Sequence, residues 1–96
     1  RQFRTSPIKR AKRIGLIRNV CVALGNIGDA EAVEPLGRTL KHEDPIIREH
    51  AAWALSQIGT PKAVQLLVNA SLTETDHEVK TELLNLVSTK QNDYSR

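Results

Sequence analysis

The stretch Ala23-Leu24-Gly25-Asn26-Ile27-Gly28 decides the fold, because it returns 31 positions later as Ala54-Leu55-Ser56-Gln57-Ile58-Gly59. A fixed period of this length, with apolar residues at helical spacing on both sides, is typical of stacked helix pairs. It predicts a solenoid in which each pair packs on its neighbours, rather than one closed core. Helical solenoids bind very different partners, so the function depends on the side chains that decorate the repeat.

Apolar residues extend the repeat at the spacing of one helical face. The first copy of this stripe holds Leu16, Val20, Ala23, Leu24 and Ile27. The second copy, 31 residues later, holds Ile47, Ala51, Ala54, Leu55 and Ile58, and a third, 32 residues further on, holds Val79, Leu83, Leu86 and Val87. Because no repeat buries its stripe alone, we expect the exposed flank of the first helix to pack on upstream sequence or on residues 1–14.

Turn and capping residues set the boundaries of the helices. Gly28 and Gly59 stand where a helix ends in a residue of positive φ. Asp29, Asp44-Pro45 and Thr60-Pro61 have the chemistry of helix starts, and Thr75 with Glu78 has the spacing of a capping box. The predicted fold class is all-α, an α-α superhelix of about two and a half repeats, with helices at about 15–27, 30–41, 45–58, 61–72 and 76–89.

Three segments follow from this pattern. Residues 1–14 form a basic lead-in, in which Ser6-Pro7 starts a short helix that Gly15 interrupts, residues 15–90 form the repeat domain, and residues 91–96 form a frayed tail. No stretch approaches the roughly 20 apolar residues that span a bilayer, so we expect no membrane contact. The chain begins at Arg1 and contains no Met, so we expect it to be a piece of a longer protein. Its single cysteine, Cys21, fits a small buried apolar side chain in a reducing cytosol.

Charge is divided unevenly along the chain. Residues 1–18 contain seven basic and no acidic side chains, whereas residues 19–96 contain seven basic and eleven acidic ones. Such a block of like charge indicates a surface for a polyanion, and nucleic acid fits it best because Lys and Arg neutralise phosphates. The expected RNA-binding residues are Arg4, Lys9, Arg10, Lys12, Arg13 and Arg18, with Asn19 within reach of the partner. The alternative is a solvated basic linker that pairs with carboxylates of the body.

Two motifs carry a resemblance to known families. The period and the Ala-Leu-x-x-Ile-Gly signature resemble short HEAT-like repeats over Gly15–Val87. The run from Ser6 to Asn26, with Lys12-Arg13-Ile14-Gly15-Leu16-Ile17-Arg18-Asn19 at its centre, is similar to the lead-in of the C-terminal HEAT-like domain of epoxyqueuosine reductase. Arg48-Glu49-His50-Ala51-Ala52-Trp53-Ala54-Leu55 is similar to the second-repeat motif of that family.

The resemblance implies a module of a bacterial cytoplasmic enzyme that reduces epoxyqueuosine in the anticodon loop of tRNA. That family uses cobalamin and two 4Fe–4S clusters, held by cysteine runs that are not present here. Cofactors are therefore expected upstream and none in this chain, and the module is expected to contact tRNA and the upstream catalytic domain. A lone cysteine cannot supply the four thiolates of a cluster.

Two other functions compete with this interpretation. A protein-interaction scaffold would use a partner face of Arg48, His50 and Trp53, and a phycobilin lyase-type module would need a chromophore pocket. For Trp53 we weigh packing against the adjacent repeat against an exposed stacking face. The sequence shows no catalytic constellation, and His42, His50 and His77 lack the spacing of metal ligands, so no catalytic or metal residue is predicted.

Overall fold

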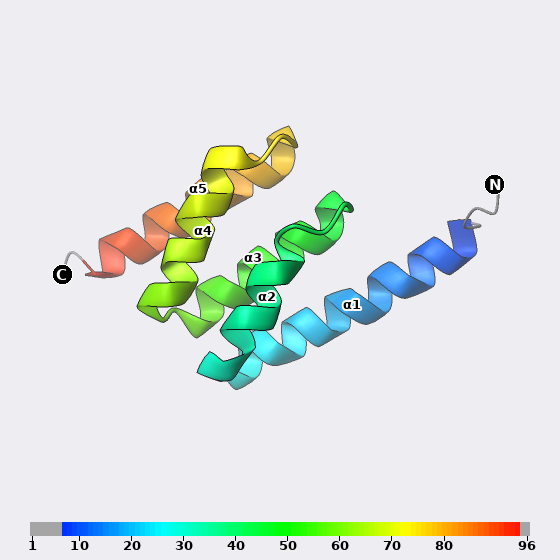
Figure 1. Ribbon diagram of the computed structural model, residues 1–96, viewed down its shortest axis with the longest axis horizontal. Helices are drawn as coiled ribbons and strands as arrows, with labels where there is room; N and C mark the ends of the chain where they lie inside the picture. Colours follow the sequence, from blue (N-terminus) through cyan, green and yellow to red (C-terminus); the bar gives the residue numbers. More distant parts are fainter. Residues whose placement is uncertain (1–6, 95–96) are drawn as a thin grey trace.

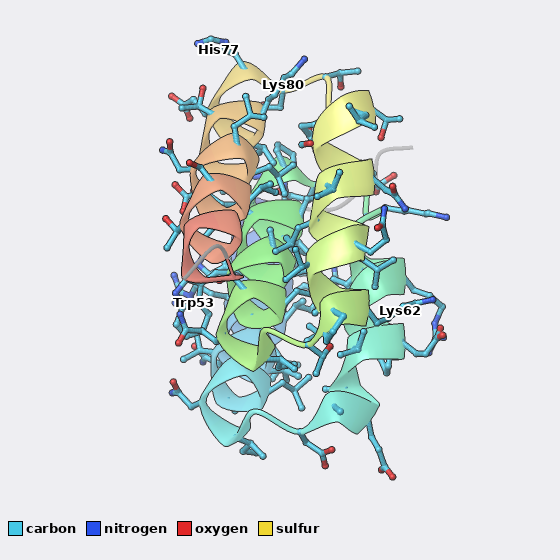
Figure 2. The ribbon with its side chains drawn as sticks, turned by 90° about the vertical axis from the view of Figure 1, so that its left-hand side faces the viewer. Trp53, Lys62, His77 and Lys80 are labelled. Atoms are coloured by element: carbon cyan, nitrogen blue, oxygen red, sulfur yellow. The ribbon has the colours of Figure 1, made fainter. Side chains whose placement is uncertain are left out.

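The computed structural model describes the backbone of residues 7–94 and the side chains of residues 8–89. Its elements are α1 (Pro7–Ile27), the 3₁₀ turn η1 (Ala30–Ala32), α2 (Val33–Thr39), α3 (Pro45–Ile58), α4 (Pro61–Thr73) and α5 (His77–Tyr94). The helices α1, α3 and α5 lie in one layer, and α2 and α4 form a second layer against them (Figures 1 and 2). The all-α superhelix predicted from the repeat is confirmed.

The core lies between the two layers and is almost entirely aliphatic. The helix α3 is its centre, because α1 and α5 flank it in its own layer and α2 and α4 cover it from the other. The second and third copies of the apolar stripe are buried as expected, except that Ile58 and Leu86 are only partly buried, and Ile47, Leu55 and Leu83 are at most 1% exposed. Each helix pair therefore completes its core with residues of the next pair, as repeat architectures require.

Most of the predicted helix boundaries are confirmed by hydrogen bonds. Gly28 and Gly59 have φ of +74° and +69°, where a side chain would be strained. The carboxylates of Asp29 and Asp44 accept from the N–H groups of Glu31 and Ile46. The hydroxyl of Thr60 accepts from the N–H of Ala63, so each of these residues satisfies an otherwise unpaired donor of its helix.

The start of α5 differs from the prediction. The carboxylate of Asp76, and not the hydroxyl of Thr75, accepts from the N–H groups of Glu78 and Val79, at 3.0 and 3.1 Å. The capping-box spacing of Thr75 and Glu78 was therefore one residue out of register. The helix that we expected to begin at Ala30 starts with the 3₁₀ turn, because Pro35 has no N–H to bond the carbonyl of Glu31.

The first and last helices are longer than predicted. We expected a break at Gly15, but α1 continues through it from Pro7 to Ile27. A glycine costs a helix interior about 1 kcal/mol, which the hydrogen bonds of the flanking turns and the burial of Ile14 offset. At the other end α5 continues to Tyr94, so most of the predicted tail of residues 91–96 is helical, and residues 95–96 lie outside the described part.

The first copy of the apolar stripe is largely exposed, unlike its two successors. Leu16 is 65% exposed, Val20 49% and Ile27 70%. The buried face of α1 instead consists of Ile14, Ile17, Cys21, Leu24 and Gly25, which pack toward α3. Residues 7–14 do not cover the stripe, because they continue the same helix in a straight line (Figure 1). A helix at the end of a stack has only one neighbour, so one of its two apolar faces stays open.

Candidate functional site

The charged site predicted from the sequence lies on a part of α1 that exceeds the repeat. The residue of α1 that corresponds to Pro45, the first residue of α3, is Ile14, so α1 has seven additional residues, Pro7–Arg13. At 1.5 Å per residue these add about 10 Å of helix, which projects past the other helices (Figure 1). This segment, called here the basic extension, contains Lys9, Arg10, Lys12 and Arg13, and α1 has no acidic residue.

Three of these four cations share one face. At 100° per residue, Lys9, Lys12 and Arg13 fall within an arc of about 100° on α1, and all three are exposed. Arg10 points instead toward the body, where its Nη2 lies 2.8 Å from Oδ2 of Asp44. The N-terminal end of α1 adds partial positive charge through its unpaired N–H groups. The face of Lys9, Lys12 and Arg13 is therefore a strongly electropositive strip.

Acidic side chains lie close to the basic extension on the side that faces the body. Arg10 and Arg13 border a hollow of about 330 Å³, together with Glu43 and Asp44 of the loop before α3. Asp44 is buried and also caps α3, so the pair with Arg10 fixes the extension to the repeat body. The alternative of a solvated linker that pairs with the body therefore holds in part, because Arg10 pairs with a carboxylate of the body.

The remaining predicted RNA-binding residues do not join this strip as a group. Arg18 is exposed but lies about 180° around α1 from Lys9, on the opposite side of the helix. Asn19 is exposed on the same side as Lys12, two turns further along. Arg4 lies outside the described residues. The structure therefore brings Lys9, Lys12 and Arg13 together, places Asn19 in line with them, and separates Arg18 from them.

Trp53 and His50 lie together on the outer side of the layer formed by α1, α3 and α5. With Val22, Glu49 and Glu82 they line a second hollow of about 330 Å³. Trp53 lies on the side of α3 away from α4 (Figure 2), and a Cβ added at Gly25 would come within 2.8 Å of its Cζ3. The indole therefore packs against α1, one of the two roles considered for it. The ring of His50 donates from Nδ1 to the carbonyl of Ile46 at 2.8 Å.

Arg48 does not belong to the face of Trp53 and His50. It is five residues from Trp53, or about 140° around α3, and its side chain turns toward the groove between α2 and α4. There Nε and Nη2 bind the two carboxylate oxygens of Glu74, at 3.0 and 2.7 Å. Nη1 also donates to the carbonyls of His42 and Glu43. Arg48 therefore joins two repeats, and the sequence contained no local signal for a partner 26 residues away.

This ion pair is buried, and both partners stay charged. Glu74 is 5% exposed and Arg48 16%. Burial by itself would raise the pKa of Glu74, but hydrogen bonds from Arg48 and from the N–H of Asp76 outweigh it and hold that pKa below its ordinary value. The hydrogen bond to Glu74 likewise raises the pKa of Arg48, against the effect of burial. The pair lies at the floor of a groove of about 510 Å³ lined by α2, α4 and the adjoining loops.

The chain's own residues do not fit an iron–sulfur cluster. Cys21 is the single cysteine, it is 2% exposed, and burial raises the pKa of its thiol. Throughout the described part of the chain, no three His, Cys, Asp or Glu side chains gather as they would around a metal ion. No helix among the described residues is long and apolar enough to cross a membrane.

Comparison with known proteins assigns the chain to a repeat family and identifies enzymes that contain similar repeats. The family pattern of HEAT repeats matches residues 10–87. Epoxyqueuosine reductase of Bacillus subtilis is 41% identical over 68 residues, 69% of this chain, and that of Xanthomonas campestris is 38% identical over 60 residues, 62% of this chain. The chain spans 17% of the length of either relative. Phycocyanobilin lyase subunit alpha of Picosynechococcus is 40% identical over 52 residues, 54% of this chain and 19% of the lyase.

The comparisons confirm the two resemblances that the sequence motifs indicated. The similarity to epoxyqueuosine reductases supports a helical module of the kind that those enzymes contain. The similarity to the lyase shows that the same repeat also occurs in proteins with another activity. The repeat is therefore a shared scaffold, and the specific features of this chain have to carry the functional argument.

Proposed function

Because this chain belongs to the HEAT-repeat family, whose stacked helices form binding surfaces, we propose that it is a non-catalytic docking module. The parent enzyme is an epoxyqueuosine reductase-like iron–sulfur oxidoreductase of the bacterial cytoplasm, and the module holds tRNA through its phosphates. Cobalamin and the 4Fe–4S clusters belong to the catalytic part of that parent protein and supply its redox chemistry. The chain's own residues bind and orient the RNA.

The observation that carries this proposal is the basic extension. The helices α3 and α5 begin at Pro45 and His77, the positions that correspond to Ile14, whereas α1 begins seven residues earlier, at Pro7. The additional residues bury little and contain four cations, so their physical use is contact with a polyanion and not support of the core. Lys and Arg side chains on a projecting helix follow phosphates without reading bases, which suits recognition of RNA by shape.

Salt dependence provides a direct test. We would replace Lys9, Lys12 and Arg13 by Gln and leave Arg10 unchanged, because Arg10 pairs with Asp44. Three phosphate contacts predict that affinity for a queuosine-class tRNA falls roughly 20- to 40-fold between about 50 and 200 mM salt. The triple variant should bind more weakly at low salt and lose most of this dependence. Fluorescence anisotropy with labelled tRNA measures both quantities.

A matched variant separates the strip from general charge. Arg38, Lys62 and Lys80 are three exposed cations on other elements, and their replacement by Gln removes the same total charge. Lys62 is on α4 and Lys80 is on α5, so neither belongs to the helix that carries the basic extension (Figure 2). Equal losses of affinity in the two variants, or an unchanged salt slope in the first, would contradict docking by the basic extension.

A protein-interaction scaffold remains the second candidate, because the molecule offers two hollows unrelated to the basic extension. One is the hollow at Trp53 and His50, and the other is the larger groove between α2 and α4. This function predicts that Trp53→Ala abolishes partner binding while the triple Gln variant leaves it unchanged. The opposite result would support RNA docking.

A further inference from the structure

The hollow at Trp53 is a feature that tRNA docking leaves unused. Its lining comes from three helices, with Val22 on α1, Glu82 on α5, and Glu49, His50 and Trp53 on α3. Trp53 marks its place on the outer side of the layer that these helices form (Figure 2). Its volume of about 330 Å³ is near the lower end of the range of sites that hold small organic groups, roughly 300–1,000 Å³. A hollow of this size suits one inserted side chain.

Two glutamates give this hollow a negative charge. Glu49 and Glu82 are both partly buried, and no ion pair or hydrogen bond joins either carboxylate to another of the described residues. Arg18 stands one turn before Val22 on α1, yet it forms no ion pair with them. Within the described part of the chain, the two negative charges therefore have no ion-pair partner.

The aromatic side chains of the hollow also suit a group that is cationic and rich in hydrogen-bond donors. One edge of the Trp53 indole packs near Gly25, and the ring forms part of the lining. The face of an indole attracts a cation. Since Nδ1 of His50 donates to the carbonyl of Ile46, the neutral imidazole keeps Nε2 as an acceptor. Carboxylates, an indole and an imidazole acceptor together favour a cationic donor over an anion.

The sign of this charge was not evident from the sequence. The partner face expected there combined Trp53 and His50 with a cation, Arg48. In the structure Arg48 binds Glu74 instead, and Glu82 of α5 borders the hollow of Trp53 and His50. The tertiary structure therefore replaces the expected positive charge of this face by a negative one.

We propose that this hollow is a binding site for an arginine side chain of a protein partner. A guanidinium group is planar, so it can stack on an indole while the N–H groups at its edge bind carboxylates. A lysine ammonium has no flat face and fewer donors. The phosphates of RNA carry the same sign of charge as Glu49 and Glu82, which repel them. A metal ion does not fit, because the described residues contain no group of three His, Cys, Asp or Glu that could hold one.

The arginine site and the basic extension are separate surfaces of opposite charge. The hollow contains none of the residues Pro7–Arg13, and the basic extension contains no acidic residue. A failure of tRNA docking would therefore leave the arginine site unaffected.

Nuclear magnetic resonance tests this site directly, because Trp53 is the single tryptophan of the chain and gives one indole N–H signal. The probe is the blocked tripeptide acetyl-Ala-Arg-Ala-amide, titrated into the isotope-labelled protein. Two further peptides carry lysine or citrulline in place of arginine, and citrulline keeps the shape of arginine without its charge. We expect a saturable shift of the Trp53 signal with the arginine peptide, an affinity at least about threefold weaker with lysine, and no binding with citrulline.

Substitution of the two glutamates identifies the cause of the binding. Glu49→Gln combined with Glu82→Gln should weaken the arginine peptide at least about fivefold, because two charge-assisted contacts are lost. Neither carboxylate has a hydrogen bond or ion pair among the described residues, so the fold should persist in this variant. The matched control, Glu34→Gln combined with Glu78→Gln, removes the same charge from exposed positions and should bind the peptide like the wild type.

Three outcomes would overturn the proposal. One is the absence of a saturable shift of the Trp53 signal at peptide concentrations up to about 10 mM. Another is an equal loss of affinity in the two double variants, which would attribute the binding to net charge alone. The third is a shift of the Trp53 signal that grows with protein concentration in the absence of peptide, because the occupant would then be a second copy of the chain.

Discussion

Two glycines of α1, ten residues apart, give opposite predictions for the same substitution. A Cβ built at Gly15 meets no atom within 4 Å, whereas one built at Gly25 meets Cζ3 of Trp53 at 2.8 Å and Cα of Ala54 at 3.1 Å. Neither glycine has a positive φ, so both sites accept the backbone of alanine. Gly15→Ala therefore tests the continuity of the helix, and Gly25→Ala tests the close approach of α1 and α3.

The expected magnitudes follow from these distances. Alanine is better than glycine in a helix interior by about 1 kcal/mol, so Gly15→Ala should raise the free energy of unfolding by about that amount. At Gly25 the same gain is opposed by overpacking against an aromatic ring and a backbone atom, which costs about 1–3 kcal/mol. Gly25→Ala should therefore leave stability unchanged or lower it by up to about 2 kcal/mol. The two variants should differ by about 1–3 kcal/mol.

Thermal unfolding followed by circular dichroism at 222 nm measures this difference. In a domain of this size 1 kcal/mol shifts Tm by about 4–8 °C, so Gly15→Ala should melt above the wild type and Gly25→Ala at or below it. Urea titrations of the same proteins give the free energies directly. A Gly15→Ala variant that melts below the wild type would refute the continuous helix. A Gly25→Ala variant as stable as Gly15→Ala would refute the close packing of α1 on Trp53.

Three further predictions concern the helix ends and the buried ion pair. Asp76→Ala should cost about 1 kcal/mol in urea unfolding, because it removes the acceptor for two N–H groups of α5, and Thr75→Ala should cost clearly less; the reverse order would place the cap at Thr75. Gly59→Ala should lower stability by about 1–2 kcal/mol, since its φ is +69°, and an unchanged Tm would contradict that conformation. Because pairing with Arg48 lowers the pKa of Glu74 from its ordinary value, the pair contributes stability at neutral pH and loses it as the pH falls through that lowered pKa. Glu74→Gln should therefore be less stable than the wild type by about 3 kcal/mol at pH 7, and by clearly less at pH 3. Urea titrations at the two pH values check this, and an equal deficit at both would exclude the ionised pair as its cause.

Most helix ends could be predicted from the sequence because they depend on the residue types at the ends themselves. Gly28 and Gly59 tolerate a positive φ, and Asp44 and Thr60 stand before prolines that start helices. The prediction failed where two adjacent residues offered similar capping groups, because Thr75 and Asp76 both carry an acceptor at a suitable distance. The choice between them depends on the path of the loop, in which Glu74 accepts from the N–H of Asp76 while it pairs with Arg48.

The candidate site was predicted in composition but not in arrangement. The run of cations from Lys9 to Arg13 was evident from the sequence, as was the stacking of helix pairs. That Arg10 turns inward to Asp44 was not, because the two residues are 34 positions apart and meet only when α3 packs on α1. The grouping of Arg48 with Trp53 was wrong for the same reason, since the partner of Arg48 belongs to the next repeat.

By itself, the sequence determined the repeat, the helical class and the charged segment, because periodicity, capping and charge are properties of residues close together in the chain. Only the tertiary structure decided which of the two apolar faces of α1 is buried. Leu16 and Ile14 are equally apolar, yet one is 65% exposed and the other 9%, because α3 covers a single side of the terminal helix. Burial depends on which neighbouring helices are present, and the sequence of a helix does not by itself determine its position in the stack.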